Sequence, residues 1–128
     1  MNKIILITGA LLGLLSIILG AFGAHGLKAH LSPENLQTFE TGVKYQMYHA
    51  LFLLFVGSTS VVSSGYKNII FYLVVTGVIL FSGSIYGLAT NQLTSFNFKS
   101  IGFITPIGGL FLIASWIVLI INLIKFKP

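Results

Sequence analysis

Residues 4–24 read IILITGALLGLLSIILGAFGA, an apolar run that contains no charged side chain. A helix needs roughly 20 apolar residues to cross the hydrocarbon core of a bilayer. The run is longer than the apolar core of a signal peptide, although Ala21 and Gly23 are small enough to precede a cleavage site. We therefore expect this segment to remain in the protein as its first membrane span.

The rest of the chain has the same apolar character. Of its 128 residues, 55% are hydrophobic and only 7% are charged, and the mean hydropathy is +0.98. A soluble domain has roughly 25% charged residues, so this chain has too few charges to build a water-exposed surface. The sequence predicts one all-α domain, an integral membrane bundle of four transmembrane helices at about residues 4–24, 45–62, 68–90 and 106–124.

A polar segment precedes the second predicted span. Ser32-Pro33-Glu34 is typical of a helix start: serine caps free N–H groups, proline suits the first turn, and glutamate favours the positive end of the helix dipole. Apolar residues then recur at helical spacing between polar ones. We expect an amphipathic interfacial segment that leads without a break into the second span.

The net charge of +5 comes from scattered lysines and two glutamates, with no arginine or aspartate. Nucleic-acid binding needs a clustered basic patch, so we expect the lipid bilayer and no nucleic acid as partner. Four spans would place both termini on one side of the membrane. That side carries Lys3, Lys67, Lys125 and Lys127, against Lys28, Lys44 and Lys99 on the other. The positive-inside rule then predicts cytoplasmic termini.

Small residues form stripes on the predicted spans, and such stripes let helix backbones approach closely. We expect tight packing within the chain or between copies of it; a substrate path lined by small residues is the alternative. The first span contributes Gly9, Gly13, Ser16, Gly20 and Gly23, the third Gly83 and Gly87, and the fourth Gly108.

Three histidines are the candidates for a ligand or proton site. His49 lies about one turn inside the second predicted span and shares a helical face with Tyr45 and Gln46. His25 and His30 flank the polar segment on the same membrane side, so all three could converge. Converging histidines could bind a transition metal, relay protons or ligate haem, although their spacing matches no metal signature. The alternative is a hydrogen-bonded structural role for His49, and no cofactor is assigned.

The sequence offers little for catalysis. It has no cysteine, no nucleophile motif, no phosphate loop and no dinucleotide fingerprint. Its only carboxylate side chains, Glu34 and Glu40, lie six positions apart on one predicted helix and converge poorly. We expect the protein not to be an enzyme.

Four motifs resemble those of a known family. They are GAFGAHGL at 20–27, TFETGVKYQMYHAL at 38–51, FSGSIYGL at 81–88 and TPIGGL at 105–110. Together, in this order, they are similar to the domain-of-unknown-function 423 (UPF0382) family of small bacterial membrane proteins. The resemblance implies about four spans and a bacterial plasma membrane, and it draws attention to His25 and His49. It implies no reaction.

These observations predict a small integral membrane protein with a structural or accessory role in membrane or envelope integrity, which forms a homo-oligomer. Other membrane proteins are a further class of partner. The alternative is a small transporter or ligand-binding membrane protein whose His49 site takes an ion, a proton or a haem-like group. An enzyme that acts on a lipid ranks third.

Overall fold

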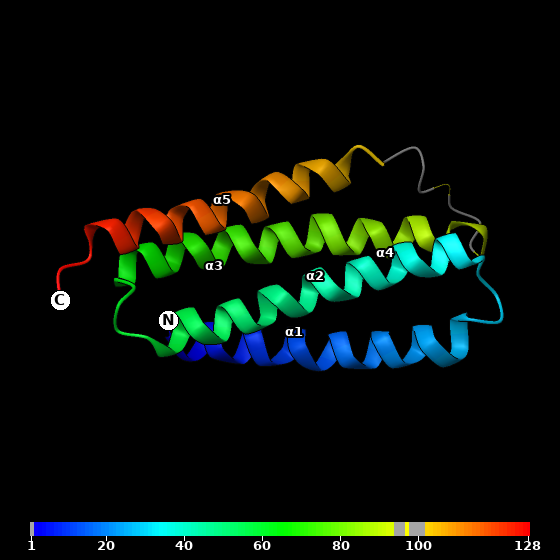
Figure 1. Ribbon diagram of the computed structural model, residues 1–128, viewed down its shortest axis with the longest axis horizontal. Coiled ribbons are helices and arrows are strands. Elements are labelled where there is room, and N and C mark those ends of the chain that lie inside the picture. The colour runs from blue at the N-terminus through cyan, green and yellow to red at the C-terminus, as the bar shows by residue number, and fades with distance from the viewer. Residues whose placement is uncertain (1, 94–96, 98–101) are drawn as a thin grey trace.

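The computed structural model describes residues 2–93, 97 and 102–128, and every regular element within them is helical (Figure 1). Lys99, placed above on the side away from the termini, lies outside the described residues. The elements are α1 (Asn2–Phe22), the π-helical turn η1 (Gly23–Leu27), α2 (Pro33–Ser58), α3 (Ser64–Val78), the π-helical turn η2 (Ile79–Gly83), α4 (Ser84–Ala89), the 3-10 turn η3 (Asn91–Leu93) and α5 (Ile104–Lys125).

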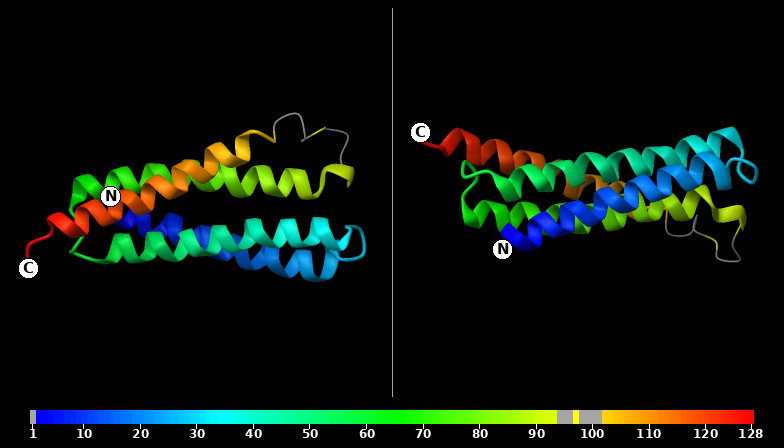
Figure 2. Two further views of the ribbon diagram at one scale, coloured as in Figure 1. Left: turned by 45° about the horizontal axis from the view of Figure 1, so that its top comes forward. Right: turned by 90° about the horizontal axis from the view of Figure 1, so that it is seen from below.

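The helices run alternately up and down in an elongated bundle (Figures 1 and 2). α3, η2 and α4 follow one another as one rod. α1 packs mainly on α2, and α5 packs mainly on α3 and η2, while α2 also contacts α3, η2 and α4. α2 therefore joins the two helix pairs. Both chain termini lie at the same end of the bundle, which we call the terminus end (Figure 1).

Three helical segments are long and apolar enough to cross a membrane: Asn2–Leu27, Ser64–Ala89 and Ile104–Lys125. The expectation of an all-helical membrane protein is confirmed to this extent. α2 is also long, with 26 residues, but it is less apolar than these segments because its first half carries both glutamates and Lys44. Whether α2 crosses the bilayer stays a prediction.

Both ends of α2 follow from local chemistry. The helix begins at Pro33, as predicted, and the Oγ of Ser32 accepts the N–H of Asn35 at 3.1 Å. It ends at Ser58, short of the predicted end at 62. The residues that follow Phe55 include glycine, serine and threonine, which are weak helix formers, and the backbone turns extended at Thr59.

The small-residue stripe of α1 lies against α2 of the same chain. A Cβ added at Gly9 would lie 3.0 Å from the carbonyl oxygen of Ala50, and one at Gly23 would lie 3.0 Å from the ring of Phe39. Side chains would thus push the two helices apart. The stripe also includes Gly13 and Gly20, which face α2 side chains, and the buried Ser16.

α5 approaches the α3–η2 rod in the same way. A Cβ on Gly108 would collide with the backbone of Leu80 and Phe81, and one on Gly77 would lie 2.6 Å from Leu112. Two glycines from facing helices therefore set this spacing.

η2 changes which residues of the rod face the bundle. A π-helical turn bonds residue i to i+5 and so adds one residue to the helical repeat. Gly87, in α4, is buried, but Gly83 is exposed and a Cβ there would meet nothing within 4 Å. The packing expected at Gly83 is therefore not made within the chain.

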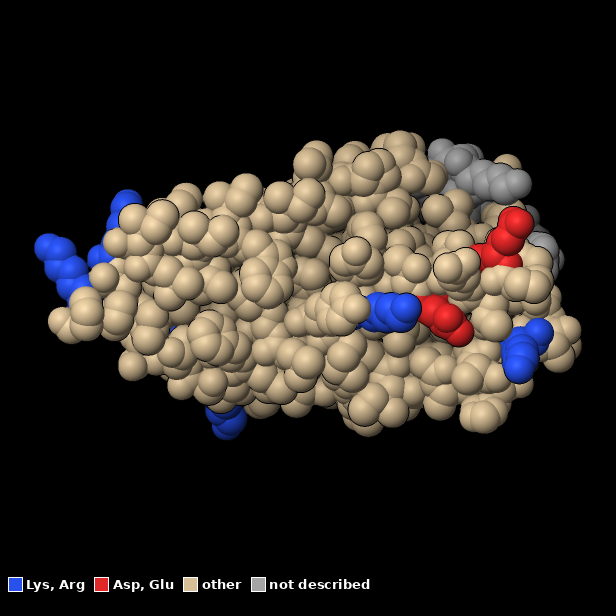
Figure 3. Space-filling view, in the orientation of Figure 1, with Lys and Arg blue, Asp and Glu red and all other residues tan. Residues whose placement is uncertain are grey.

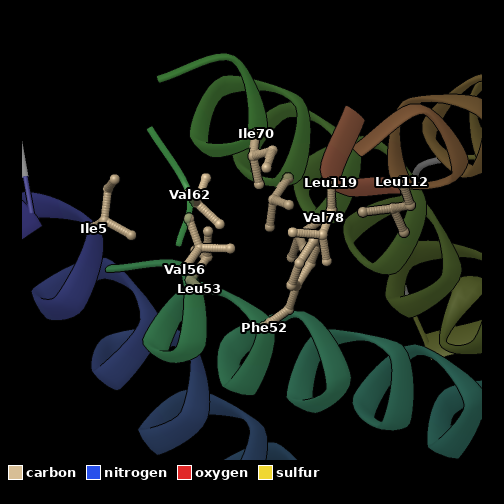
Figure 4. Packing of buried hydrophobic residues seen from close by; sticks show 10 residues of the cluster. Ile5, Phe52, Leu53, Val56, Val62, Ile70, Val78, Leu112 and Leu119 are labelled. Atoms are coloured by element: carbon tan, nitrogen blue, oxygen red, sulfur yellow. The ribbon is translucent and has the colours of Figure 1, made fainter. Parts of the chain in front are cut away.

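Buried apolar side chains fill the bundle toward the terminus end. Figure 4 shows side chains of α1, α2, the α2–α3 loop, α3 and α5 meeting there. Lipid tails are as apolar as these side chains, so close van der Waals contact rather than removal from water holds them together. A smaller cluster at the opposite end consists of Leu27, Leu31, Phe39 and Ala89.

The fit at Gly108 predicts a sharp difference between neighbouring substitutions. Gly108→Ala should lower the free energy of unfolding by about 1–3 kcal/mol, because a methyl group would overlap a helix backbone that cannot move aside. Gly109→Ala is the matched control: its Cβ would lie 3.6 Å from the ring of Phe81, an ordinary contact. Thermal unfolding of both variants in mild detergent measures the effect; equal stability would contradict the close α5 packing.

Candidate ligand site around His49

His49 is held by two hydrogen bonds inside the bundle, where its side chain is 4% exposed. The indole N–H of Trp116, from α5, donates to Nε2 of His49 at 3.0 Å. An indole nitrogen only donates, so Nε2 must be the unprotonated acceptor. The proton then sits on Nδ1, which donates to the carbonyl oxygen of Tyr45 at 2.7 Å. His49 is therefore a neutral imidazole of defined tautomer with both nitrogens engaged.

Aromatic rings fix the position of this pair. The ring of Trp116 stacks on Phe52, with centroids 4.1 Å apart and planes 11° apart. The edge of His49 meets both rings at centroid distances of 6.0 and 6.2 Å. Since the stacked ring sets the direction of the indole N–H, the hydrogen bond to His49 is preorganised.

An apolar groove of about 290 Å³ opens beside the pair, between α2, η2 and α5. Tyr45 is 41% exposed at its edge, and its hydroxyl makes no hydrogen bond within the described residues. Such a groove suits an apolar group with at most one polar atom. The other main lining residues are His49, Phe81, Leu112, Ile113 and Trp116.

Gln46 lies one turn from His49 but belongs to a different contact. Its amide nitrogen donates to the carbonyl oxygen of Leu12 at 2.9 Å, and its amide oxygen accepts the hydroxyl of Tyr86 at 2.6 Å. These bonds connect α2 to α1 and α4, whereas His49 faces α5. The structure thus separates Gln46 from the site that the helical wheel predicts for it.

His25 and His30 do not join His49. Both are exposed, His25 in η1 and His30 in the turn before α2. His49 lies 16 residues after the start of α2 at Pro33, which is about 24 Å of helix. Within the described residues, no group of three or more histidine, cysteine or acidic side chains is placed to hold a metal ion. The expected convergence of three histidines is therefore not found.

Sequence reasoning missed the partners of these polar residues. An aromatic residue of a membrane span is expected to pack or to anchor at the interface, yet Trp116 donates to His49. The same expectation holds for Tyr86, yet it binds Gln46. The available signal was that Gln46 and His49 are two polar residues three positions apart in an apolar stretch, which need donors or acceptors from other helices.

Comparison with known proteins places this arrangement in a family. The family profile described as "Protein of unknown function (DUF423)" matches residues 19–109, which include α2 and the rod from α3 to α4. The chain belongs to the DUF423 (UPF0382) family. The family resemblance of the four motifs is thereby confirmed.

Named relatives extend the match over nearly the whole chain. A UPF0382 membrane protein of Staphylococcus haemolyticus is 45% identical over 124 residues, which cover 97% of this chain and 98% of the relative. The UPF0382 membrane protein YwdK of Bacillus subtilis is 40% identical over 126 residues, with the same coverage of both chains. No solved structure matches this chain. The protein is thus a small membrane protein of a family whose function is not known.

The hydrogen bond to Trp116 predicts the state of His49. In the wild-type protein in nanodiscs, ¹⁵N NMR of the imidazole should show a protonated Nδ1 and an unprotonated Nε2. Trp116→Phe should lower the free energy of unfolding by about 1–3 kcal/mol and release Nε2, because a buried acceptor loses its donor. Ile117→Ala, at an exposed position of α5 next to Trp116, leaves the indole and its stacked ring in place and should keep the wild-type spectrum. A mixture of tautomers in the wild type would contradict the bond.

Proposed function

We propose that this protein is a non-enzymatic structural or accessory component of the bacterial plasma membrane, that it supports membrane or envelope integrity, and that it associates with copies of itself. The observation that carries the proposal is that buried polar side chains form hydrogen bonds to neighbouring helices. The groups that could do chemistry within the bundle are hydrogen-bonded across helices: His49 to α5, and Gln46 to α1 and α4. Groups used in this way stabilise a bundle, and neither His49 nor Gln46 is free to act as an acid, base or nucleophile.

The order of the helices supports four membrane spans. The start of α1 and the start of α3 lie at the same end, because Lys67 Nζ donates to Asn2 Oδ1 at 3.1 Å. If α1 and the α3–α4 rod both cross the bilayer in this direction, the chain between them must cross back, and only α2 is available. Its 26 residues extend about 39 Å, more than the roughly 30 Å hydrocarbon core. The glutamates in its first half can thus stay near the interface, and Lys44 can extend toward it.

Charge supports cytoplasmic termini in this arrangement. The terminus end carries Lys3, Lys67, Lys125 and Lys127, and no acidic side chain is drawn there in Figure 3. Both glutamates belong to the half of α2 near the opposite end. An excess of lysine on one side is typical of the cytoplasmic side.

Self-association is supported by an open surface and not by the stripe on α1, which α2 already covers. Gly83 borders an apolar groove of about 350 Å³ between α1 and the α3–α4 rod. A Cβ at Gly83 would meet nothing within 4 Å. A bare glycine backbone beside a groove is a place where a helix of a second copy can approach closely.

The Gly83 surface predicts an oligomer that a larger side chain disrupts. Chemical crosslinking in native membranes should give dimers or larger species for the wild type, and Gly83→Leu should reduce them several-fold because leucine blocks the close approach. Gly65→Leu is the matched control, since Gly65 also faces open space but lies outside the groove. Only monomer in the wild type, or equal loss in both variants, would contradict this part of the proposal.

A ligand-binding role is the second candidate, and the groove beside His49 favours it. The occupied nitrogens of His49 argue for an apolar ligand there and against an ion, a proton or a haem-like group. Gly109→Leu should fill the groove from the α5 side. Native mass spectrometry of wild type and variant from nanodiscs should then show a discrete bound mass that the variant loses. If the wild type carries only lipid of the disc and the variant carries it equally, this candidate fails.

A further inference from the structure

Lys67 is a buried cation without a countercharge. Its side chain is only 6% exposed, near the start of α3. Its ammonium group has three N–H donors, and one of them meets the amide oxygen of Asn2 at 3.1 Å. That contact is the one Nζ makes within the described residues. An amide oxygen is a neutral acceptor, so the contact leaves the positive charge uncompensated.

No acidic side chain of the chain is near enough to compensate it. The only two are Glu34 and Glu40, in the first half of α2. Glu40 precedes the end of α2 at Ser58 by 18 residues, which is about 27 Å of helix. Burial of an unpaired charge is strongly unfavourable, so a buried lysine normally has a partner of opposite charge. Lys67 has no anionic partner among the described residues, so its countercharge has to come from outside them or be replaced by solvent.

Lys67 lines a polar cavity of about 300 Å³ at the terminus end. Ser60 and Ser63 of the α2–α3 loop, Ser64 at the start of α3 and Asn2 at the start of α1 also line it, and the hydroxyl of Ser63 donates to Asn122 Oδ1 at 3.5 Å. Ser63 is the N-cap of α3, but its side chain makes no capping bond. The first N–H groups of α3 therefore have no intrahelical or capping partner. The residues that carry the Lys67 ammonium, the hydroxyls of Ser60 and Ser64 and the uncapped start of α3 thus line one cavity.

We propose that this cavity binds a phosphate group, supplied either by a phospholipid headgroup or by free phosphate. Lysine and the N-terminus of a helix both favour a phosphate oxyanion, and hydroxyl donors complete its coordination. The cavity lies at the terminus end, where α1 and α3 begin. In the proposed membrane arrangement, this end is at the depth of the lipid headgroups. The phosphate supplies the countercharge that the chain lacks.

α5, which does not line the cavity, forms hydrogen bonds to the loop that does. Asn122 of α5 accepts the backbone N–H of Ser63 at 3.2 Å and donates to the carbonyl oxygen of Val61 at 3.0 Å. The hydroxyl of Ser63 also donates to Asn122 Oδ1, at 3.5 Å, so α5 holds the loop that lines the cavity. In the proposed site, α5 positions the loop and contributes no group that binds the phosphate.

Two arms of one experiment test the proposal on the full chain and distinguish the sources of phosphate. In the first arm, the protein in a phosphate-free maltoside detergent is titrated with inorganic phosphate and followed by ³¹P NMR. In the second, native mass spectrometry measures retained phosphatidylglycerol after release from phosphatidylglycerol nanodiscs. Saturable binding in the first arm identifies free phosphate, and retention in the second arm alone identifies a headgroup. Binding in neither arm overturns the proposal.

Variants assign the binding to the cavity. Lys67→Met keeps the length of the side chain and removes its charge, and it should weaken binding by about tenfold or more. Lys67→Arg should restore it. Lys3→Met removes an exposed lysine from the same end and should leave binding unchanged. If Lys3→Met and Lys67→Met lose binding equally, the attraction belongs to the surface and the proposal is wrong.

A further variant covers the case in which Lys67→Met does not fold. Ser64→Ala leaves Lys67 and its bond to Asn2 in place and removes one hydroxyl donor of the cavity. It should weaken binding several-fold while thermal stability without phosphate stays at the wild-type value. Unchanged binding in this folded variant would count against the cavity as the site.

Discussion

The buried polar side chains of α2 need partners on other helices, because a buried polar group without a hydrogen bond is costly. α2 is the least apolar long helix of the chain, and it lies where it can contact both helix pairs. Gln46 uses a carbonyl of α1 and a hydroxyl of α4, and His49 uses the indole of α5. The carbonyl oxygen of Gly42 accepts the hydroxyl of Ser82 in η2 at 2.8 Å. α2 therefore makes the hydrogen bonds that connect the two helix pairs.

Close backbone contact makes these bonds possible. The hydroxyl of Ser82 reaches the backbone of Gly42 because Gly42 has no side chain: a Cβ there would lie 2.7 Å from the ring of Tyr86. Glycines likewise allow α1 to pack closely on α2, and α5 to pack closely on the α3–η2 rod. Glycine and hydrogen bond act together at Gly42, since the short distance between the helices brings the Ser82 hydroxyl within reach of its acceptor.

Much of the fold could be predicted because it depends on local pattern. The start of α2 follows from serine, proline and glutamate in sequence, and the stripe on α1 predicts a packed face by its spacing alone. The partners in the site could not be predicted, since Trp116 reaches His49 from 67 positions away and nothing in the spacing links them. η2 was hidden as well, because a π-helical turn leaves no signature in composition. The burial of Lys67 was hidden because a lysine beside a predicted span ordinarily lies at the surface.

The dependence of α2 on its neighbours has a consequence for how the protein is made. In the proposed arrangement, α1 emerges from the ribosome first and is apolar enough to enter the bilayer unaided. α2 carries two glutamates and a lysine and would partition poorly by itself. Its glycine-lined partner, already in place, offers it a matching surface and a carbonyl for Gln46. In this arrangement, α1 assists the membrane insertion of α2. A substitution that disrupts the small-residue stripe of α1 would then appear as failed membrane insertion of α2.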